Sequence, residues 1–419
     1  MPMYRVLDKK VQDNPLLGMH LFGMRIFGLY IFGSQSVPFL HWFRGLFFSI
    51  TFTIFNVTQH VDLISLWGNV DEMTTNAATT LLFTTTVFRL VNFFRNRETY
   101  TNIVARLDDM LSQLMDTEVP EERDIIEKNL KYTRTLTLGF WTIALTTGNL
   151  MCVQSFILSF LYEPHDVYDP VTNTTQTSFP PVILRSWFPF DDQWEHFYTV
   201  YFVQFYNMWV GMIIVPCWHS FMVALMVFAI LRLQILNHQF QHVEVYVLGG
   251  MYNAKRSNVE RQQSPKNLLN FLAESVVEQV KIREYVKQLE KLISGSIFLD
   301  FVVFSVLLCA LLFQGTHVKF GVESIIIVCY ITTMIVILWM YYWHANEISL
   351  HSEKLAISLY KSNWYEHDVI YQKAVLQCMV GSNRLMKMQA GFVVMTLHSF
   401  LKILQASYSY FTLLTQVAN

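Results

Sequence analysis

Residues 198–231 read YTVYFVQFYNMWVGMIIVPCWHSFMVALMVFAIL and contain no Asp, Glu, Lys or Arg. An α-helix needs about 20 mostly apolar residues to cross the hydrocarbon core of a bilayer. The run therefore predicts a membrane-spanning helix that continues beyond the bilayer. Pro216 lies inside the run and marks a position where this helix can kink.

Six further apolar runs lie on either side of this stretch. Residues 74–94, the second run along the chain, are rich in threonine, and residues 391–416, the last run, are interrupted by Lys402 and Gln405. Both are still expected to span the membrane, because a polar stripe is typical of a helix that lines water. The sequence thus predicts an all-α membrane protein with seven transmembrane helices. The six other runs are residues 39–59, 74–94, 136–161, 293–314, 322–343 and 391–416.

The overall composition agrees with a protein in lipid. Of the 419 residues, 53% are hydrophobic and only 15% are charged, whereas about a quarter of the residues in soluble domains are charged. Aromatic residues make up 15%, which suits interfacial belts and apolar pockets. The five cysteines lie far apart without a CxxC spacing, so we expect them to be buried and reduced.

The sequence gives no support for an enzyme. The patterns GxxxxGK[ST], GxGxxG, HExxH and GxSxG are all missing from it, so nucleotide, dinucleotide, zinc-protease and serine-nucleophile chemistry are disfavoured. His238 and His242 are four residues apart and could share a metal, but no third ligand is near them in sequence. A solvated helix face is the more common meaning of such a pair. We expect no cofactor, no metal and no nucleic-acid partner.

The basic residues predict the orientation of the chain. The N-terminal tail and segments 95–135, 232–291 and 345–388 hold most of the lysines and arginines, whereas the alternate segments hold only Arg185 and Lys319. Cytoplasmic loops carry the excess of basic residues in membrane proteins. We therefore expect a cytoplasmic N-terminus and, after seven crossings, an extracellular C-terminus.

The connecting segments refine this topology. Asn173 begins an Asn-Thr-Thr glycosylation sequon in the outer loop 162–194, as expected on the extracellular side. Residues 249–266 combine glycine, proline and charge without periodicity and predict a mobile cytoplasmic loop. In residues 267–292 the apolar residues recur at helical spacing, so the fifth crossing is expected to continue as a cytoplasmic helix.

These features divide the chain into six segments. They are a cytoplasmic N-terminal segment (1–38), the first four transmembrane helices (39–231), a cytoplasmic loop and helix (232–292), the fifth and sixth transmembrane helices (293–343), cytoplasmic helices (344–390), and the last helix with the extracellular C-terminus (391–419).

The C-terminal third holds the most specific motifs. Residues 352–364 read SEKLAISLYKSNW, with Tyr360 and Trp364 one helical turn apart, and residues 398–416 read HSFLKILQASYSYFTLLTQ. Both segments, and above all the Ser-Tyr-Ser-Tyr-Phe run that begins at Ser407, resemble the insect odorant-receptor family. The seven spans and the inverted topology relative to G-protein-coupled receptors agree with this resemblance along the whole chain.

The resemblance implies a function. Members of this family form odorant-gated, nonselective cation channels of four subunits, usually as a heterotetramer with an obligate co-receptor in the plasma membrane of olfactory neuron dendrites. The co-receptor is usually longer between its fourth and fifth helices, so this chain looks like the odorant-tuned subunit. By the same resemblance, residues 39–231 would form the ligand-binding bundle for small volatile, apolar or aromatic odorants. Tyr360 and Trp364 would belong to a subunit anchor within residues 344–390.

The outer halves of the second, third, fourth and sixth helices supply candidates for the odorant pocket. Sites for small apolar ligands are lined mainly by aromatic residues with a few polar groups. Any one of these aromatic residues is more commonly a core or lipid contact, but as a set they define a search area, in which Gln204 is a further polar candidate. The candidate ligand-binding residues are Thr79, Phe83, Asn149, Phe156, Tyr201, Phe205, Trp209 and Tyr330.

The last helix offers candidate pore residues. One face carries a small, partly polar stripe of residues, namely Lys402, Ala406, Ser409, Leu413 and Val417. This stripe fits a pore lining and ordinary small-residue helix packing about equally well. The resemblance favours the pore, because matching Tyr410 and Phe411 to the corresponding pair of the co-receptor puts Leu413 and Val417 at its gate. Ser409 and Gln416 would then meet the hydrated cation on either side.

Asp300 lies inside the fifth apolar run, where a charge is costly unless it faces protein or water. Lys402 is a possible partner, since both residues lie part-way along helices that rise from the cytoplasm. Lys402 could equally face the vestibule of the pore, and the sequence leaves the two alternatives open.

Two other functions remain as alternatives at this stage. One is a seven-helix receptor that signals through G proteins, and the other is a polytopic transporter or membrane enzyme. An extracellular C-terminus argues against the first. The second is disfavoured because the chain shows no inverted repeat.

Overall fold

The computed structural model describes residues 14–28, 39–161, 166–169, 174–177, 182–189, 196–249, 260–318 and 321–418. Its elements follow one another as α2 (Gly18–Ile26), α3 (Phe39–Ser65), α4 (Val70–Arg95), α5 (Arg97–Met115), α6 (Pro120–Leu161), β1 (Asp166–Asp169), β2 (Thr174–Thr177), α7 (Phe197–Gln241), α8 (Val243–Gly249), α9 (Glu260–His317), α10 (Val322–Lys361), η1 (Trp364–Glu366), α11 (Val369–Ser382), β3 (Gln389–Ala390), β4 (Val393–Val394) and α12 (Leu397–Ala418).

Each of the seven predicted spans falls on a helix. Within the described residues, α4, α6, α7, α9 and α10 contain stretches that are apolar and long enough to cross a membrane. Helices α3 and α12 have 27 and 22 residues, which is also sufficient length. The prediction of an all-α protein with seven such helices is confirmed.

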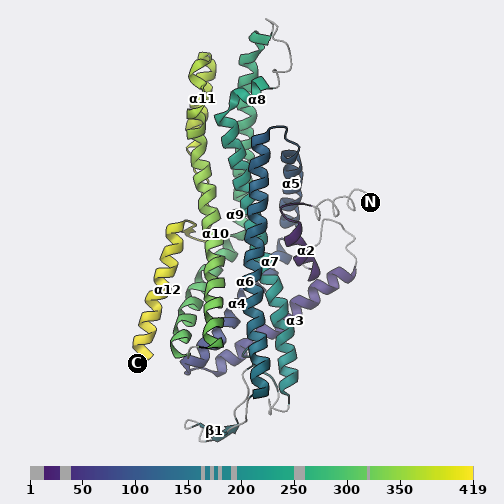
Figure 1. Cartoon of the computed structure of the whole chain (residues 1–419), viewed down its shortest axis with the longest axis vertical. Helices are drawn as coiled ribbons and strands as arrows, with labels where there is room; N and C mark the ends of the chain where they lie inside the picture. The colour runs from purple at the N-terminus through teal and green to yellow at the C-terminus, as the bar shows by residue number, and fades with distance from the viewer. Residues whose placement is uncertain are drawn as a thin grey trace.

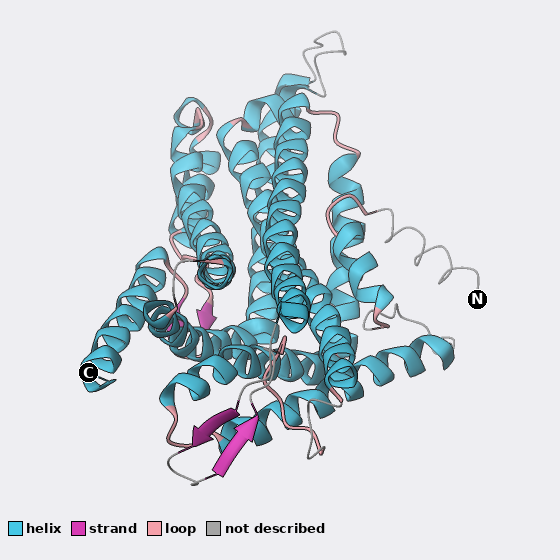
Figure 2. Cartoon of the chain, turned by 60° about the horizontal axis from the view of Figure 1, so that its bottom comes forward, coloured by secondary structure: helices cyan, strands magenta, loops and turns pink. Residues whose placement is uncertain are grey.

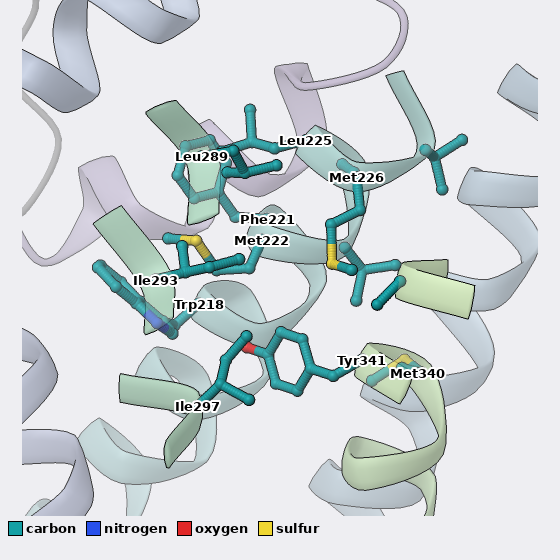
Figure 3. Close-up of a cluster of buried hydrophobic side chains, with 14 of the residues drawn as sticks. Trp218, Phe221, Met222, Leu225, Met226, Leu289, Ile293, Ile297, Met340 and Tyr341 are labelled. Atoms are coloured by element: carbon teal, nitrogen blue, oxygen red, sulfur yellow. The ribbon is translucent and has the colours of Figure 1, made fainter. Parts of the chain in front are cut away.

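Helix α7 lies at the centre of the bundle. Of its most apolar stretch, 89% is buried inside the molecule, compared with 22% for α6. A helix that is apolar on all sides can be covered by other helices on all sides, and α7 packs against α6, α9 and α10. Figure 3 shows its Trp218 and Phe221 beside Leu289 and Ile293 of α9, and all four side chains are buried.

Long helices carry the bundle beyond the predicted spans. Helix α9 has 58 residues, so the predicted continuation of the fifth crossing through residues 267–292 is confirmed. Figure 1 shows α8 and α11 at one end of the long axis and the antiparallel β1–β2 hairpin at the other. The loop expected at residues 249–266 lies largely outside the described residues; from Glu260 onward the chain is already helical.

One helix boundary differs from the sequence-based expectation. The last helix begins at Leu397 rather than at residue 391, because residues 389–390 pair with residues 393–394 around Gly391, which has a φ of +61°. A left-handed residue of this kind ends the preceding segment in a tight turn and favours glycine. Helix α12 then leaves the main bundle and lies at its side, as Figure 2 also shows.

The N-terminal segment contains a feature that the sequence did not predict. Helix α2 packs against α7, with Nδ1 of His20 hydrogen-bonded to Oγ of Ser220 at 3.0 Å. Trp141 of α6 donates to the same hydroxyl at 3.1 Å. Asn14, just before α2, donates to Asp108 of α5 at 2.8 Å. Short glycine-containing segments such as this one give only a weak helical pattern, so the sequence did not reveal the docking.

Candidate functional site

A cavity of about 70 Å³ lies among four helices near the centre of the bundle. Its lining comes from α4, α6, α7 and α10, which are the second, third, fourth and sixth transmembrane helices. The lining is almost entirely apolar, with Thr147 and Thr333 as a polar pair whose hydroxyl oxygens are 3.4 Å apart. The lining residues are Thr79, Leu82, Phe83, Ala144, Thr147, Gly148, Met151, Met208, Gly211, Met212, Val215, Pro216, Tyr330, Thr333, Met334 and Ile337.

Three of the eight candidate ligand-binding residues line this cavity. Phe83 stacks on Phe52 of α3, with ring centroids 4.7 Å apart. Tyr330 donates its hydroxyl hydrogen to the carbonyl of Ala78 at 2.7 Å, which fixes the ring against α4. The Thr79 hydroxyl donates to the carbonyl of Asn76 at 3.3 Å. The hydroxyls of Tyr330 and Thr79 are thus engaged with the backbone of α4.

The other five candidates lie elsewhere. Tyr201, Phe205 and Trp209 form a row of rings along α7 with successive centroids 6.1 Å apart, and Phe156 joins it 5.6 Å from Tyr201. Phe156 and Trp209 are exposed on the surface of the isolated chain. The amide of Asn149 donates to the carbonyl of Leu145 on its own helix at 2.8 Å. The structure therefore separates this aromatic row from the cavity.

Sequence reasoning missed the methionines that line the cavity. Met151, Met208, Met212 and Met334 face it from α6, α7 and α10. Methionine side chains are flexible and polarisable, so they can repack around ligands of different shapes. A search for methionine as well as aromatic residues in these spans would have found them.

Gln204 also has a structural role, near the N-terminal end of α7. It accepts from the backbone N–H of Leu184 at 3.1 Å and donates to Ser186 at 3.0 Å. These bonds hold residues 182–189 against the bundle, where Leu184 is buried. Gln204 therefore fixes the segment that precedes α7 and does not line the cavity.

Helix α12 has one packed face and one exposed face. Phe400, Ile403 and Ser407 are buried against the bundle, where α12 contacts α9 and α10. Ser409 and Gln416 are exposed, as is Leu413 at 58%. Val417 belongs to the helix, but its side chain lies outside the described residues.

The candidates outside the bundle are placed as follows. Tyr360 is 69% exposed near the end of α10, and its carbonyl accepts from Nε1 of Trp364 at 3.3 Å. Asn173 lies outside the described residues.

Among the described residues no group of His, Cys, Asp and Glu could hold a metal ion. His238 is half-buried and bonded to the Tyr246 hydroxyl at 2.8 Å, so only His242 fits the expected solvated face.

Asp300 has a partner that sequence reasoning did not consider. Its carboxylate forms an ion pair with Arg89 of α4, and both side chains are almost fully buried. Lys402 is exposed on α12, so the suggested pairing of Asp300 with Lys402 is wrong. The two partners are 211 positions apart in the chain, and no local pattern connects them.

Comparisons with known proteins identify the family. The family described as 7tm Odorant receptor matches residues 69–408. The chain is 27% identical to Odorant receptor 56a of Drosophila melanogaster, over 96% of this chain and 95% of that protein. It is 26% identical to Odorant receptor Or2 of Anopheles gambiae, over 88% and 91%.

A comparison of structures agrees with this result. The olfactory receptor OR5 of the insect Machilis hrabei has the same fold, with a TM-score of 0.76, 14% identity and 99% of both chains covered. That receptor has also been solved in complex with eugenol. The matched proteins are receptors, in agreement with the missing enzyme motifs. This chain is a multi-pass membrane protein that belongs to the insect odorant receptor family.

Proposed function

We propose that this odorant receptor is the odorant-tuned subunit of a ligand-gated, nonselective cation channel, assembled as a heterotetramer with a co-receptor in the plasma membrane of olfactory neuron dendrites. The observation that carries the ligand-binding part is the apolar cavity lined by α4, α6, α7 and α10. Such a lining selects small apolar or aromatic volatiles through burial of their surface. The hydroxyls of Thr147 and Thr333 donate to the carbonyls of Ile143 and Cys329 on their own helices, so the cavity offers a ligand mainly apolar contacts.

The exposed face of α12 supports the channel part of the proposal. A membrane helix that packs with only one face leaves the other face for lipid, for another subunit or for water. The exposed face of α12 combines Lys402 and Ser409 with Leu413, a mixture that suits a water-filled path with an apolar constriction. Around a central axis, Leu413 and Val417 would form the gate, with Ser409 and Gln416 beside it.

The proposal also includes a subunit anchor, a glycosylation site and a membrane topology. Tyr360 is largely exposed on the projecting end of α10, and with Trp364 it would form part of the contact between subunits. Asn173 would be glycosylated on the extracellular side. The cytoplasmic N-terminus and extracellular C-terminus complete the proposed topology.

Patch-clamp recording of cells that express this chain with and without the co-receptor tests the proposal. The odorant panel should include eugenol, because a related receptor has been solved with that compound. We expect a volatile-evoked cation current that needs both chains and persists when G-protein signalling is blocked. A response that persists without the co-receptor and vanishes under the block would refute the channel and favour a receptor coupled to G proteins.

A further inference from the structure

Four buried polar side chains lie close together in the core of the bundle. Arg89 of α4 and Asp300 of α9 form the ion pair described above. His219 of α7 and Tyr341 of α10 form a hydrogen bond, with Nδ1 and the hydroxyl oxygen 2.8 Å apart. Phe304, one turn from Asp300 along α9, contacts the His219 ring at a centroid distance of 6.5 Å. Polar groups at membrane depth are costly to bury, and where they occur they usually serve function.

The His219–Tyr341 bond lies one helical turn from the cavity on both of its helices. Val215 of α7 and Ile337 of α10 line the cavity. Each of them precedes its polar neighbour by four residues, which is about 6 Å along a helix axis. The hydrogen bond therefore connects α7 to α10 one helical turn away from the cavity lining.

The next residue of α10 connects this bond to α12. The ring of Tyr342 packs against Phe400 of α12, with centroids 6.5 Å apart. Within residues 337–342 of α10, Ile337 lines the cavity, Tyr341 forms the hydrogen bond to α7, and Tyr342 contacts α12. Helix α10 is therefore both a wall of this cavity and a neighbour of α12.

The size of the cavity indicates that a ligand must move its walls. Its volume is about 70 Å³, whereas a cavity of about 150 Å³ is known to hold benzene. An aromatic odorant must therefore displace lining side chains, and Val215 and Ile337 are among those at the end nearest the bond. Displacement of α10 relative to α7 would lengthen the His219–Tyr341 bond.

The polar cluster also has unused hydrogen-bonding capacity. Within the part of the chain that the structure describes, Nε2 of His219, Nε of Arg89 and Oδ2 of Asp300 have no hydrogen-bond partner. An unpaired polar atom in a buried network is energetically costly, so an arrangement that gives these atoms partners would be favoured. A second arrangement of α10 can therefore exchange one set of bonds for another.

We propose that the His219–Tyr341 hydrogen bond is a latch between α7 and α10 that holds the ligand-free arrangement and couples odorant occupancy of the cavity to movement of α12. The proposal rests on the proposed channel function. A ligand then acts by favouring the arrangement in which the latch is broken, and the equilibrium shifts by its differential affinity for the two arrangements. Tyr341 and His219 are positioning residues, because neither lines the cavity.

The test compares two neighbouring tyrosines on the same helix. Tyr341→Phe removes the bonded hydroxyl, and Tyr342→Phe removes an unbonded one while it keeps the ring that contacts Phe400. Both variants are recorded with the co-receptor, and currents are normalised to surface expression. For Tyr341→Phe we expect a half-maximal odorant concentration about three- to tenfold lower and a larger odorant-free current, since loss of one hydrogen bond destabilises the latched state. Tyr342→Phe should leave both quantities unchanged, and the order of odorant preference should stay the same in both variants.

A second variant keeps the proposal testable if Tyr341→Phe does not reach the surface. His219→Leu breaks the same bond from the other side and should shift the half-maximal concentration in the same direction. The combined variant should shift it no further than the larger single effect, because both changes remove one interaction. Unchanged or higher half-maximal concentrations, equal effects of the two tyrosine variants, or additive effects of Tyr341→Phe and His219→Leu would overturn the latch. A wild-type chain without odorant-evoked current would instead count against the channel proposal itself.

Discussion

At the scale of single residues, the cavity depends on a glycine. A Cβ atom at Gly148 of α6 would meet the sulfur of Met212, which lines the cavity from α7. Gly148→Ala should therefore push the flexible Met212 side chain into the ligand space. We expect a several-fold rise in the half-maximal concentration, largest for the bulkiest odorants, because overpacking a well-packed region costs about 1–3 kcal/mol.

A matched control lies on the same helix. A Cβ at Gly139 would meet no atom within 4 Å, so Gly139→Ala should leave the odorant response unchanged. Dose–response curves for small and large odorants measure both variants. Adding Met212→Ala to Gly148→Ala should restore the response to large odorants. If it does not, Gly148 does not affect the response through Met212 and the cavity.

The sequence could not predict which individual aromatic residues line the cavity. Phe83 and Trp209 are both aromatic residues in apolar runs, but Phe83 is buried at the cavity and Trp209 is 38% exposed. Which of them faces inward depends on the rotation of each helix about its own axis. That rotation is set by contacts with helices distant in sequence, so composition alone could not separate them.

At the scale of elements, helix boundaries were largely predictable and helix partners were not. Runs of apolar residues predicted every crossing, because the length that spans a bilayer is a local property of the chain. The partner of Asp300 required knowledge that α4 packs against α9. The docking of α2 was missed for the same reason, since His20 contacts a residue two hundred positions away.

Helix α12 carries the prediction that concerns the gate. Leu413 is exposed on its outer half, and an apolar ring on a symmetry axis can stop ions by dewetting. Leu413→Ser should raise odorant-free current without a change in odorant preference, because the cavity is untouched. Whole-cell leak normalised to surface expression is the measurement.

Leu401 provides the control on the same helix. It is similarly exposed, at 54%, but lies about 18 Å from Leu413 along the axis and on a different face. Leu401→Ser should not raise odorant-free current. If leak is unchanged in Leu413→Ser, or rises equally in both variants, the gate lies elsewhere.

At the scale of the whole molecule, the arrangement of the helices bears on topology. The C-terminal end of α12 and the β1–β2 hairpin lie toward the same end of the long axis (Figure 1). The outer loop and the C-terminus should therefore share a compartment. An epitope placed after Asn419 should be labelled on unpermeabilised cells, and one inserted within residues 250–259 should be labelled only after permeabilisation. The reverse pattern would invert the proposed orientation.

The docking of α2 has a consequence for how the protein is made. His20 binds Ser220, and the two are 200 positions apart, so the ribosome must synthesise most of α7 before α2 has its binding surface. At about 5–20 residues per second, this leaves α2 undocked for about 10–40 s. Residues 14–28 should accordingly be open to protease in chains stalled before residue 197 and protected in full-length chains. The amino end of this receptor is thus translated first but joins the bundle late, and a substitution such as Ser220→Ala should prolong its exposure to the quality-control machinery of the cell.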